Sequence, residues 1–89
     1  MEIFYGKTFS KDLDDLRNQP KVRKNLLDLI KKIKDMKSLR EVKDIKKIEG
    51  YEDYFRIKIG DYRLGFKLNQ DKIELIRFLH RKEIYRRFP

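Results

Sequence analysis

Three cations fall on one face of an expected β-hairpin in the second half of the chain. Apolar and polar residues alternate over residues 54–59, so Arg56 and Lys58 share the polar face of a strand. A tight connection at Gly60-Asp61 follows, and antiparallel pairing would bring Arg63 of the next strand alongside them. Like charges that face one another cost stability. The arrangement therefore indicates an anion-binding site, and the alternative is a basic face that is only solvated.

Residues 77–89 form a second basic segment, in which Glu83 is the one acid and His80 and Tyr85 are interleaved. Basic residues with an interleaved aromatic typically bind phosphates and stack on an unpaired base. Taken alone, His80 is more often structural or exposed than catalytic, and Tyr85 is more often a packed aromatic. The basic residues of this segment are Arg77, Arg81, Lys82, Arg86 and Arg87.

Several other chemistries have no residues to support them. The chain has no cysteine and one histidine, so it offers neither a thiol nucleophile nor the ligand spacing of a metal site. It also has no glycine-rich phosphate loop. An enzyme with these residues would act on a phosphodiester with cations and protons alone, which is feasible where the substrate supplies its own nucleophile. RNA does so with its 2′-hydroxyl.

Charge and size limit the partner and the architecture. The chain carries 24 Lys and Arg against 15 Asp and Glu, a formal net charge of +9 over 89 residues. Such a charge attracts polyanions, so nucleic acid is the first candidate partner. Five Tyr and six Phe are more than a disordered chain of this charge would carry. We expect one folded domain over residues 1–89, because a chain this short has room for one core.

No segment predicts a contact with a membrane. No apolar run approaches the roughly 18 residues of a membrane helix, and the start MEIFY lacks the basic and apolar regions of a signal peptide. The absence of cysteine is typical of a cytosolic protein, whose fold does not depend on disulfide bonds. We therefore expect a cytoplasmic protein.

The first half of the chain predicts one strand and two helices. Residues 3–5 are β-branched or aromatic and favour a strand. Ser10 is the expected N-cap of a first helix, with Asp12 in its first turn and its end near Asn18. Pro20 suits the first turn of a second helix, and the two helices should form a hairpin packed on a sheet. The apolar stripe of the second helix comprises Val22, Leu26, Leu29, Ile33 and Met36, widened by Leu27 and Ile30.

The second half predicts the sheet. Residues 38–49 fit either a helical turn or a strand, and we place a short strand near Ile48. The expected fold class is α+β, with an N-terminal strand, a two-helix hairpin packed on a mainly antiparallel four-stranded sheet, and a short C-terminal helix. The remaining elements are strands over residues 54–59, 62–68 and 73–79, turns at residues 49–53 and 69–71, and a helical turn over residues 83–88.

Two stretches carry a family resemblance. YFRIKIGDYRL (residues 54–64) and IRFLHRKEIY (residues 76–85) resemble the core of the RelE/ParE toxin superfamily. Each motif is short, but their order, their spacing and the preceding helix hairpin match together. The resemblance implies a β-α-α-β-β-β fold like that of microbial ribonucleases, and for the RelE branch an endoribonuclease that cuts messenger RNA in the ribosomal A site.

The resemblance also implies site residues. The functional cluster of the family falls on Arg56, Lys58, Arg63, Arg81 and Tyr85, with His80 close by. Arg56 departs from the family, which typically has Lys there, and because Arg is almost never deprotonated we expect Arg56 to bind phosphate. The basic segment adds Arg77, Lys82 and Arg86 as phosphate-binding candidates.

Catalytic roles can be assigned on the same basis. The proton acceptor would be Lys58, which lies among other cations, or His80, because an imidazole is a common general base, and we prefer Lys58. Arg63 and Arg81 would stabilise the charged phosphorane, an effect often worth about 3 to 4 kcal/mol per donor. Tyr85 would stack on or orient the nucleotide and share proton delivery to the 5′-oxygen with His80 or Arg81. We expect no metal and no other cofactor.

The resemblance implies a cognate antitoxin as partner, besides messenger RNA and the ribosome. We expect a monomer alone and a hetero-oligomer with the antitoxin. Two alternatives stay open: a ParE-like inhibitor that binds DNA gyrase without catalysis, and an accessory module with sequence-independent affinity for nucleic acid. The converging cations favour the ribonuclease over the gyrase inhibitor.

Overall fold

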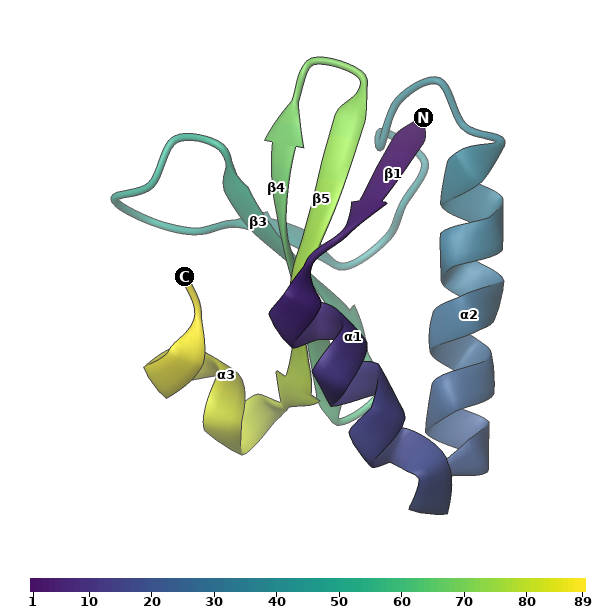
Figure 1. Ribbon diagram of the computed structural model, residues 1–89. Coiled ribbons are helices and arrows are strands. Elements are labelled where there is room, and N and C mark those ends of the chain that lie inside the picture. Colours follow the sequence, from purple (N-terminus) through teal and green to yellow (C-terminus); the bar gives the residue numbers. More distant parts are fainter.

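A five-stranded sheet with helices on both sides organises the computed structural model, which describes residues 1–89 (Figure 1). Among its helices, none has both the length and the apolar composition needed to cross a membrane. The elements in chain order are β1 (Glu2–Tyr5), α1 (Lys7–Asp14), the 3-10 turn η1 (Asp15–Asn18), α2 (Pro20–Lys34), β2 (Ile45–Lys47), β3 (Tyr54–Ile59), β4 (Tyr62–Asn69), β5 (Lys72–His80) and α3 (Arg81–Arg87).

The strands lie in the order β1-β5-β4-β3-β2, with β1 parallel to β5 and every other pair antiparallel. The α+β class and the mainly antiparallel sheet are confirmed. The sheet has five strands where four were expected, because the N-terminal strand β1 pairs with β5 and joins the four strands that follow it in the chain. At the other edge, β2 pairs with β3. This strand begins at Ile45, before the expected position at Ile48, and Ile45 packs against the core while Lys46 is exposed.

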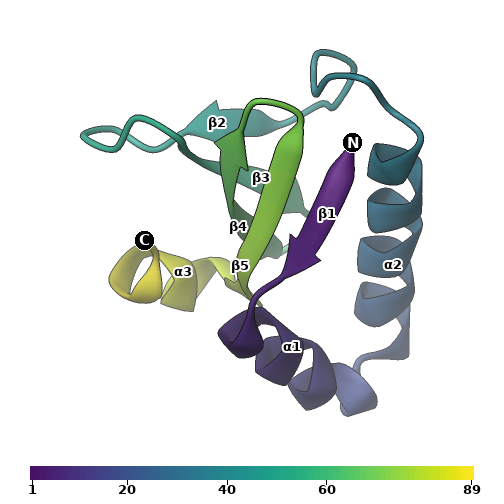
Figure 2. The same ribbon diagram turned by 45° about the horizontal axis from the view of Figure 1, so that its top comes forward.

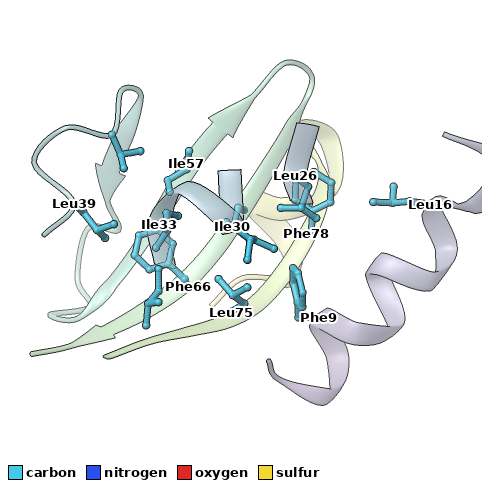
Figure 3. Close-up of a cluster of buried hydrophobic side chains, with 13 residues drawn as sticks. Phe9, Leu16, Leu26, Ile30, Ile33, Leu39, Ile57, Phe66, Leu75 and Phe78 are labelled. Carbon is cyan, nitrogen blue, oxygen red and sulfur yellow. The ribbon is translucent and has the colours of Figure 1, made fainter. Parts of the chain in front are cut away.

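The main core lies between α2 and one face of the sheet, as Figure 3 shows. Burial of one such aliphatic or aromatic side chain contributes about 1.5 to 3 kcal/mol. The stripe predicted for α2 is confirmed, since all five of its residues lie in the core or pack against it, whereas Leu27 lies outside it and is exposed. The buried side chains of this core include Leu26, Ile30 and Ile33 from α2 and Ile57, Leu64, Phe66, Ile73, Leu75 and Phe78 from the strands.

The first helix begins earlier than predicted. Ser10 is not its N-cap, because the chain turns directly from β1 into α1 at Gly6 and the Ser10 N–H donates to the Gly6 carbonyl at 3.0 Å. The Gly6 N–H in turn donates to the Leu75 carbonyl of β5 at 2.9 Å. Asp12 therefore lies beyond the first turn of α1, and its side chain is buried.

The second face of the sheet is partly covered by α3, on the side opposite α2 (Figure 2). Ile84 and Phe88 are buried there. The Phe88 ring lies directly on Gly65 of β4, where a Cβ atom would meet three ring atoms at 2.8 Å. A residue without a side chain at position 65 thus lets the end of α3 approach the backbone of β4.

Candidate functional site

A pocket of about 290 Å³ opens where β2, β3, β4 and α3 meet. We call it the cation pocket. Four of its seven lining residues are basic, and one, Asp44, is acidic, so the pocket carries a net positive charge. Its lining consists of Asp44, Ile45, Lys46, Arg56, Lys58, Arg63 and Tyr85.

Strand register places the cations of the pocket in two cross-strand pairs. Lys58 of β3 lies opposite Arg63 of β4, as the alternation of the sequence predicts. Arg56 lies opposite Gly65 on one side and opposite Lys46 of β2 on the other. Directly opposed like charges destabilise a sheet. Two such pairs on one surface suit an anion that the protein binds there.

Tyr85 reaches the pocket from the middle of α3. Its ring lies over the Arg56 guanidinium, with 4.5 Å between the guanidinium carbon and the ring centre. The side chain is 64% exposed, although the helix around it is anchored by buried Ile84 and Phe88. A planar side chain in this position can stack on a nucleotide base held by the cations.

The Arg63 guanidinium is held in place by the turn of its own hairpin. Its Nη1 donates to the carbonyl oxygens of Gly60 and Tyr62, both at 2.9 Å. Its Nε and Nη2 make no hydrogen bond within the protein, so they can donate to an anion. Prior orientation of a donor removes the reorganisation cost at the moment of reaction.

Two residues of the site were not predicted. Lys46 and Asp44 come from the segment that fits both helix and strand, so local alternation does not assign their side chains to a face of the sheet. Asp44 has a φ of 61° and its carbonyl oxygen accepts a hydrogen bond from the Lys58 N–H at 3.1 Å. That bond fixes the chain beside β3 and brings Asp44 to the pocket.

His80 and Arg81 lie outside the cation pocket. The His80 Nδ1 accepts the N–H of Lys82 at 3.2 Å, which makes His80 the N-cap of α3, and the imidazole packs edge-on against Tyr62. The Arg81 Nε lies 3.9 Å from a carboxylate oxygen of Asp61, and both side chains are exposed. Lys82 is exposed on the first turn of α3. These three residues therefore flank the start of α3 and do not converge with Lys58 and Arg63.

Arg77 also lies outside the pocket, in a buried ion pair. Its Nε and Nη2 donate to the two carboxylate oxygens of Asp12, each at 2.9 Å. One of these oxygens also accepts the Phe78 N–H at 2.9 Å. Pairing between β1 and β5 ends at Leu75, so Asp12 satisfies a strand edge that β1 no longer covers. The charge of Arg77 is neutralised within the fold, and we assign it a structural role.

The remaining candidate, Arg86, borders the pocket. Its Nη2 lies 3.1 Å from the Glu83 carboxylate, and it lines a neighbouring groove together with Tyr85. A larger hollow, of about 900 Å³, lies elsewhere, between η1 and α2, and its charged lining includes two acids beside three bases. No group of three or more His, Cys, Asp or Glu side chains is placed to hold a metal ion.

A family model and a curated protein match most or all of the chain. Residues 3–85 match the family model described as the ParE toxin of type II toxin-antitoxin systems, parDE. The curated protein Toxin RelE3 of Methanocaldococcus jannaschii is 43% identical over 90 residues, which cover all of both chains.

Solved structures show the same fold. The RelB-RelE antitoxin-toxin complex from Methanococcus jannaschii contains a chain that is 42% identical, with a TM-score of 0.82 and coverage of 97% of this chain and 99% of that one. The YoeB dimer from Staphylococcus aureus, 17% identical, matches with a TM-score of 0.73 over 90% of this chain and 95% of that one, which shows likeness of fold alone. The chain therefore belongs to the RelE/ParE superfamily of toxins from type II toxin-antitoxin systems.

Proposed function

We propose that this toxin is a metal-independent endoribonuclease that cuts messenger RNA on the ribosome, in the cytoplasm. The observation that carries the proposal is the convergence of Lys46, Arg56, Lys58 and Arg63 with Tyr85 in one pocket. The close relationship to a RelE toxin supports it. In this proposal the RNA supplies its own nucleophile, the 2′-hydroxyl next to the cleaved phosphate.

The proposed step is attack of a 2′-hydroxyl oxygen on the adjacent phosphorus. The new O–P bond forms as the bond to the 5′-oxygen breaks, which leaves a 2′,3′-cyclic phosphate and a 5′-hydroxyl. Negative charge develops on the phosphorane, and Arg56, Lys58 and Arg63 stabilise it; one well-placed donor contributes about 3 to 4 kcal/mol. Tyr85 stacks on the nucleotide and delivers a proton to the departing 5′-oxygen.

Three side chains of the pocket can accept the proton of the 2′-hydroxyl, namely Lys46, Lys58 and Asp44. We assign the proton to Asp44, because a carboxylate is unprotonated at neutral pH, whereas a lysine ammonium must first lose a proton. Lys58 then keeps its charge and acts on the phosphate. This assignment replaces the preference for Lys58 that the sequence alone suggested. Arg81, Lys82 and Arg86, which are exposed along α3, bind phosphates further along the message.

We further propose that an antitoxin neutralises the toxin by covering the cation pocket. The support is the related toxin chain, 42% identical, that was solved in complex with the antitoxin RelB. A net charge of +9 favours a partner with an acidic segment. Toxin purified together with the product of a neighbouring gene should contain that protein in stoichiometric amount and should not cleave RNA until it is removed.

A second candidate function follows from the family model, whose name is that of a ParE toxin. A ParE-like inhibitor would bind DNA gyrase and carry out no chemistry. Expression of the toxin without antitoxin separates the two, if protein synthesis, transcript ends and DNA supercoiling are followed in the same cells. We expect translation to stop and transcripts to carry new 5′-hydroxyl ends. Intact transcripts with relaxed or broken DNA would establish the gyrase inhibitor instead.

The purified toxin provides the chemical test. Cleavage of ribosome-bound message should leave a 2′,3′-cyclic phosphate. Because ribosomes need magnesium, metal independence is measured on a naked RNA oligonucleotide, where the rate should be the same with EDTA as without it. A requirement for a divalent ion on that substrate would rule out the proposed step.

A further inference from the structure

A second groove, of about 510 Å³, borders the cation pocket. It lies between the β2–β3 connection and the C-terminal end of α3, which face each other in both Figure 1 and Figure 2. We call it the lateral groove. It shares Lys46, Arg56 and Tyr85 with the cation pocket, so the two hollows are continuous. An RNA strand bound in the cation pocket would therefore continue into the lateral groove on this side.

Tyr51 gives the lateral groove an aromatic surface. Its side chain is 50% exposed, although Tyr51 lies in the turn that connects β2 to β3. The ring packs edge-on against Tyr54, with 5.8 Å between ring centres, and Tyr54 packs against Phe88 at 5.9 Å. This row of rings anchors Tyr51 on the sheet. An aromatic side chain that is held in place and still half exposed can accept a stacking base with little loss of conformational freedom.

Cations accompany the aromatic ring. Lys47 and Arg86 line the lateral groove beyond the three shared residues, against one acid, Glu49. Arg86 is paired with Glu83 on the surface, and an exposed ion pair of this kind contributes little to stability. Its guanidinium can therefore exchange this partner for a phosphate. Sites that bind single-stranded nucleic acid typically combine an aromatic side chain, on which a base stacks, with cations that neutralise the phosphates of the nucleic-acid backbone.

We propose that the lateral groove binds the nucleotide one step beyond the two that flank the cleaved bond of a single-stranded RNA, with its base stacked on Tyr51 and its phosphate held by Lys47 and Arg86. This inference rests on the proposed ribonuclease function. The inference adds a subsite at which binding depends on the presence of a base. It also identifies Tyr51 as a binding residue outside the cation pocket.

The first experiment compares RNA tetranucleotides that differ by one missing base. An abasic residue is placed in turn on either side of the two nucleotides that flank the cleaved bond. The variant Tyr51→Leu should lower kcat/KM at least about fivefold for the complete tetranucleotide, since stacking of one base contributes about 1 kcal/mol or more. For one of the two abasic substrates, wild type and Tyr51→Leu should be equal. An equal loss on all three substrates would overturn the subsite.

A matched control variant is Phe4→Leu. Phe4 lies on β1, at the opposite edge of the sheet, and is 48% exposed. Its neighbours include Lys67 of β4 and Lys72 of β5. Phe4 is therefore, like Tyr51, an exposed aromatic residue beside cations, but it lies away from the lateral groove. Phe4→Leu should leave kcat/KM unchanged on all three substrates. A loss equal to that of Tyr51→Leu would mean that any exposed ring has this effect, which would also overturn the proposal.

Binding of a tetranucleotide that cannot be cleaved, with 2′-O-methyl groups throughout, separates the subsite from the ribonuclease function. If the toxin cleaves no RNA but binds this probe at least about fivefold more tightly than Tyr51→Leu does, the subsite stands and the proposed reaction falls. If the wild type cleaves RNA and Tyr51→Leu binds the probe equally well, the subsite falls and the reaction stands. Loss of antitoxin binding by Tyr51→Leu, with unchanged affinity for the probe, would assign the groove to the antitoxin and overturn the proposal.

Discussion

The guanidinium of Arg56 lies 4.5 Å from the centre of the Tyr85 ring, and this contact joins β3 to α3. A cation over an exposed aromatic ring is worth about 0.5 to 1 kcal/mol. The contact therefore aligns the two side chains without holding α3 on the sheet, which the packing of Phe88 on Gly65 does. A nucleotide base can displace Tyr85 from Arg56 at small cost.

The cations of the pocket should be required for activity and dispensable for folding. We expect Arg56→Ala, Lys58→Ala and Arg63→Ala each to lower the cleavage rate by about 100-fold, because each removes a donor to the phosphorane. The free energy of unfolding, measured by urea denaturation, should change by no more than about 0.5 kcal/mol. Lys58→Ala should be neutral or stabilising, since it removes repulsion from Arg63 across the strands.

Lys31→Ala, on the exposed surface of α2, is the matched control for these variants and should leave activity unchanged. A pocket variant that lost activity together with its fold would have a structural role instead.

Asp44→Asn should slow cleavage by at least about 100-fold, the lower range for loss of a general base. Asn tolerates the left-handed conformation that Asp44 adopts at φ 61°, so the backbone should be unaffected. Lys58→Arg is the complementary variant, because it keeps the charge but cannot serve as a base at neutral pH. It should retain most of the activity in the same kinetic assay. The reverse pattern would assign proton transfer to Lys58.

Gly65→Ala, on β4 beneath the end of α3, should disturb the position of Tyr85 in the cation pocket. The added Cβ would lie 2.8 Å from three atoms of the Phe88 ring, so this ring must shift, and we expect the end of α3 to move with it; overpacking of this kind typically costs about 1 to 3 kcal/mol. The shift separates Tyr85 from Arg56, and we expect cleavage to fall with stability.

A double-mutant cycle checks the cause of that loss. Phe88→Leu removes the ring, so Gly65→Ala should cost less stability in its presence than in the wild type. Additive effects of the two substitutions on the free energy of unfolding would contradict the packing of Phe88 on Gly65.

Arg77→Ala should destabilise the protein by about 3 kcal/mol or more, because it leaves the buried Asp12 carboxylate without its partner. Arg86→Ala removes the exposed pair with Glu83 and should cost less than about 1 kcal/mol in the same denaturation experiment. Adding Asp12→Asn to Arg77→Ala should restore part of the stability, since no charge then stays buried. Equal costs for Arg77→Ala and Arg86→Ala would show that burial of the pair contributes little.

The sequence by itself determined the elements and one face of the site. Alternation with a period of two is a local property of a strand, so the order of residues alone places Arg56, Lys58 and Arg63 together. The spacing of apolar residues located α2 for the same reason. The motifs carried by β3, β4, β5 and α3 were sufficient for the family.

Only the tertiary structure decided which other residues complete the site and which do not. Asp12 and Arg77 are 65 positions apart, and Phe88 meets Gly65 across 23 positions, so no local period relates them. Arg77 was expected to bind phosphate because its partner, Asp12, lies in a distant part of the sequence. The role of His80 was also decided by the tertiary structure. The chain turns from β5 into α3 at this residue, so His80 becomes the N-cap of α3. Local periodicity fixes the face of a side chain, whereas its partners depend on how distant elements pack.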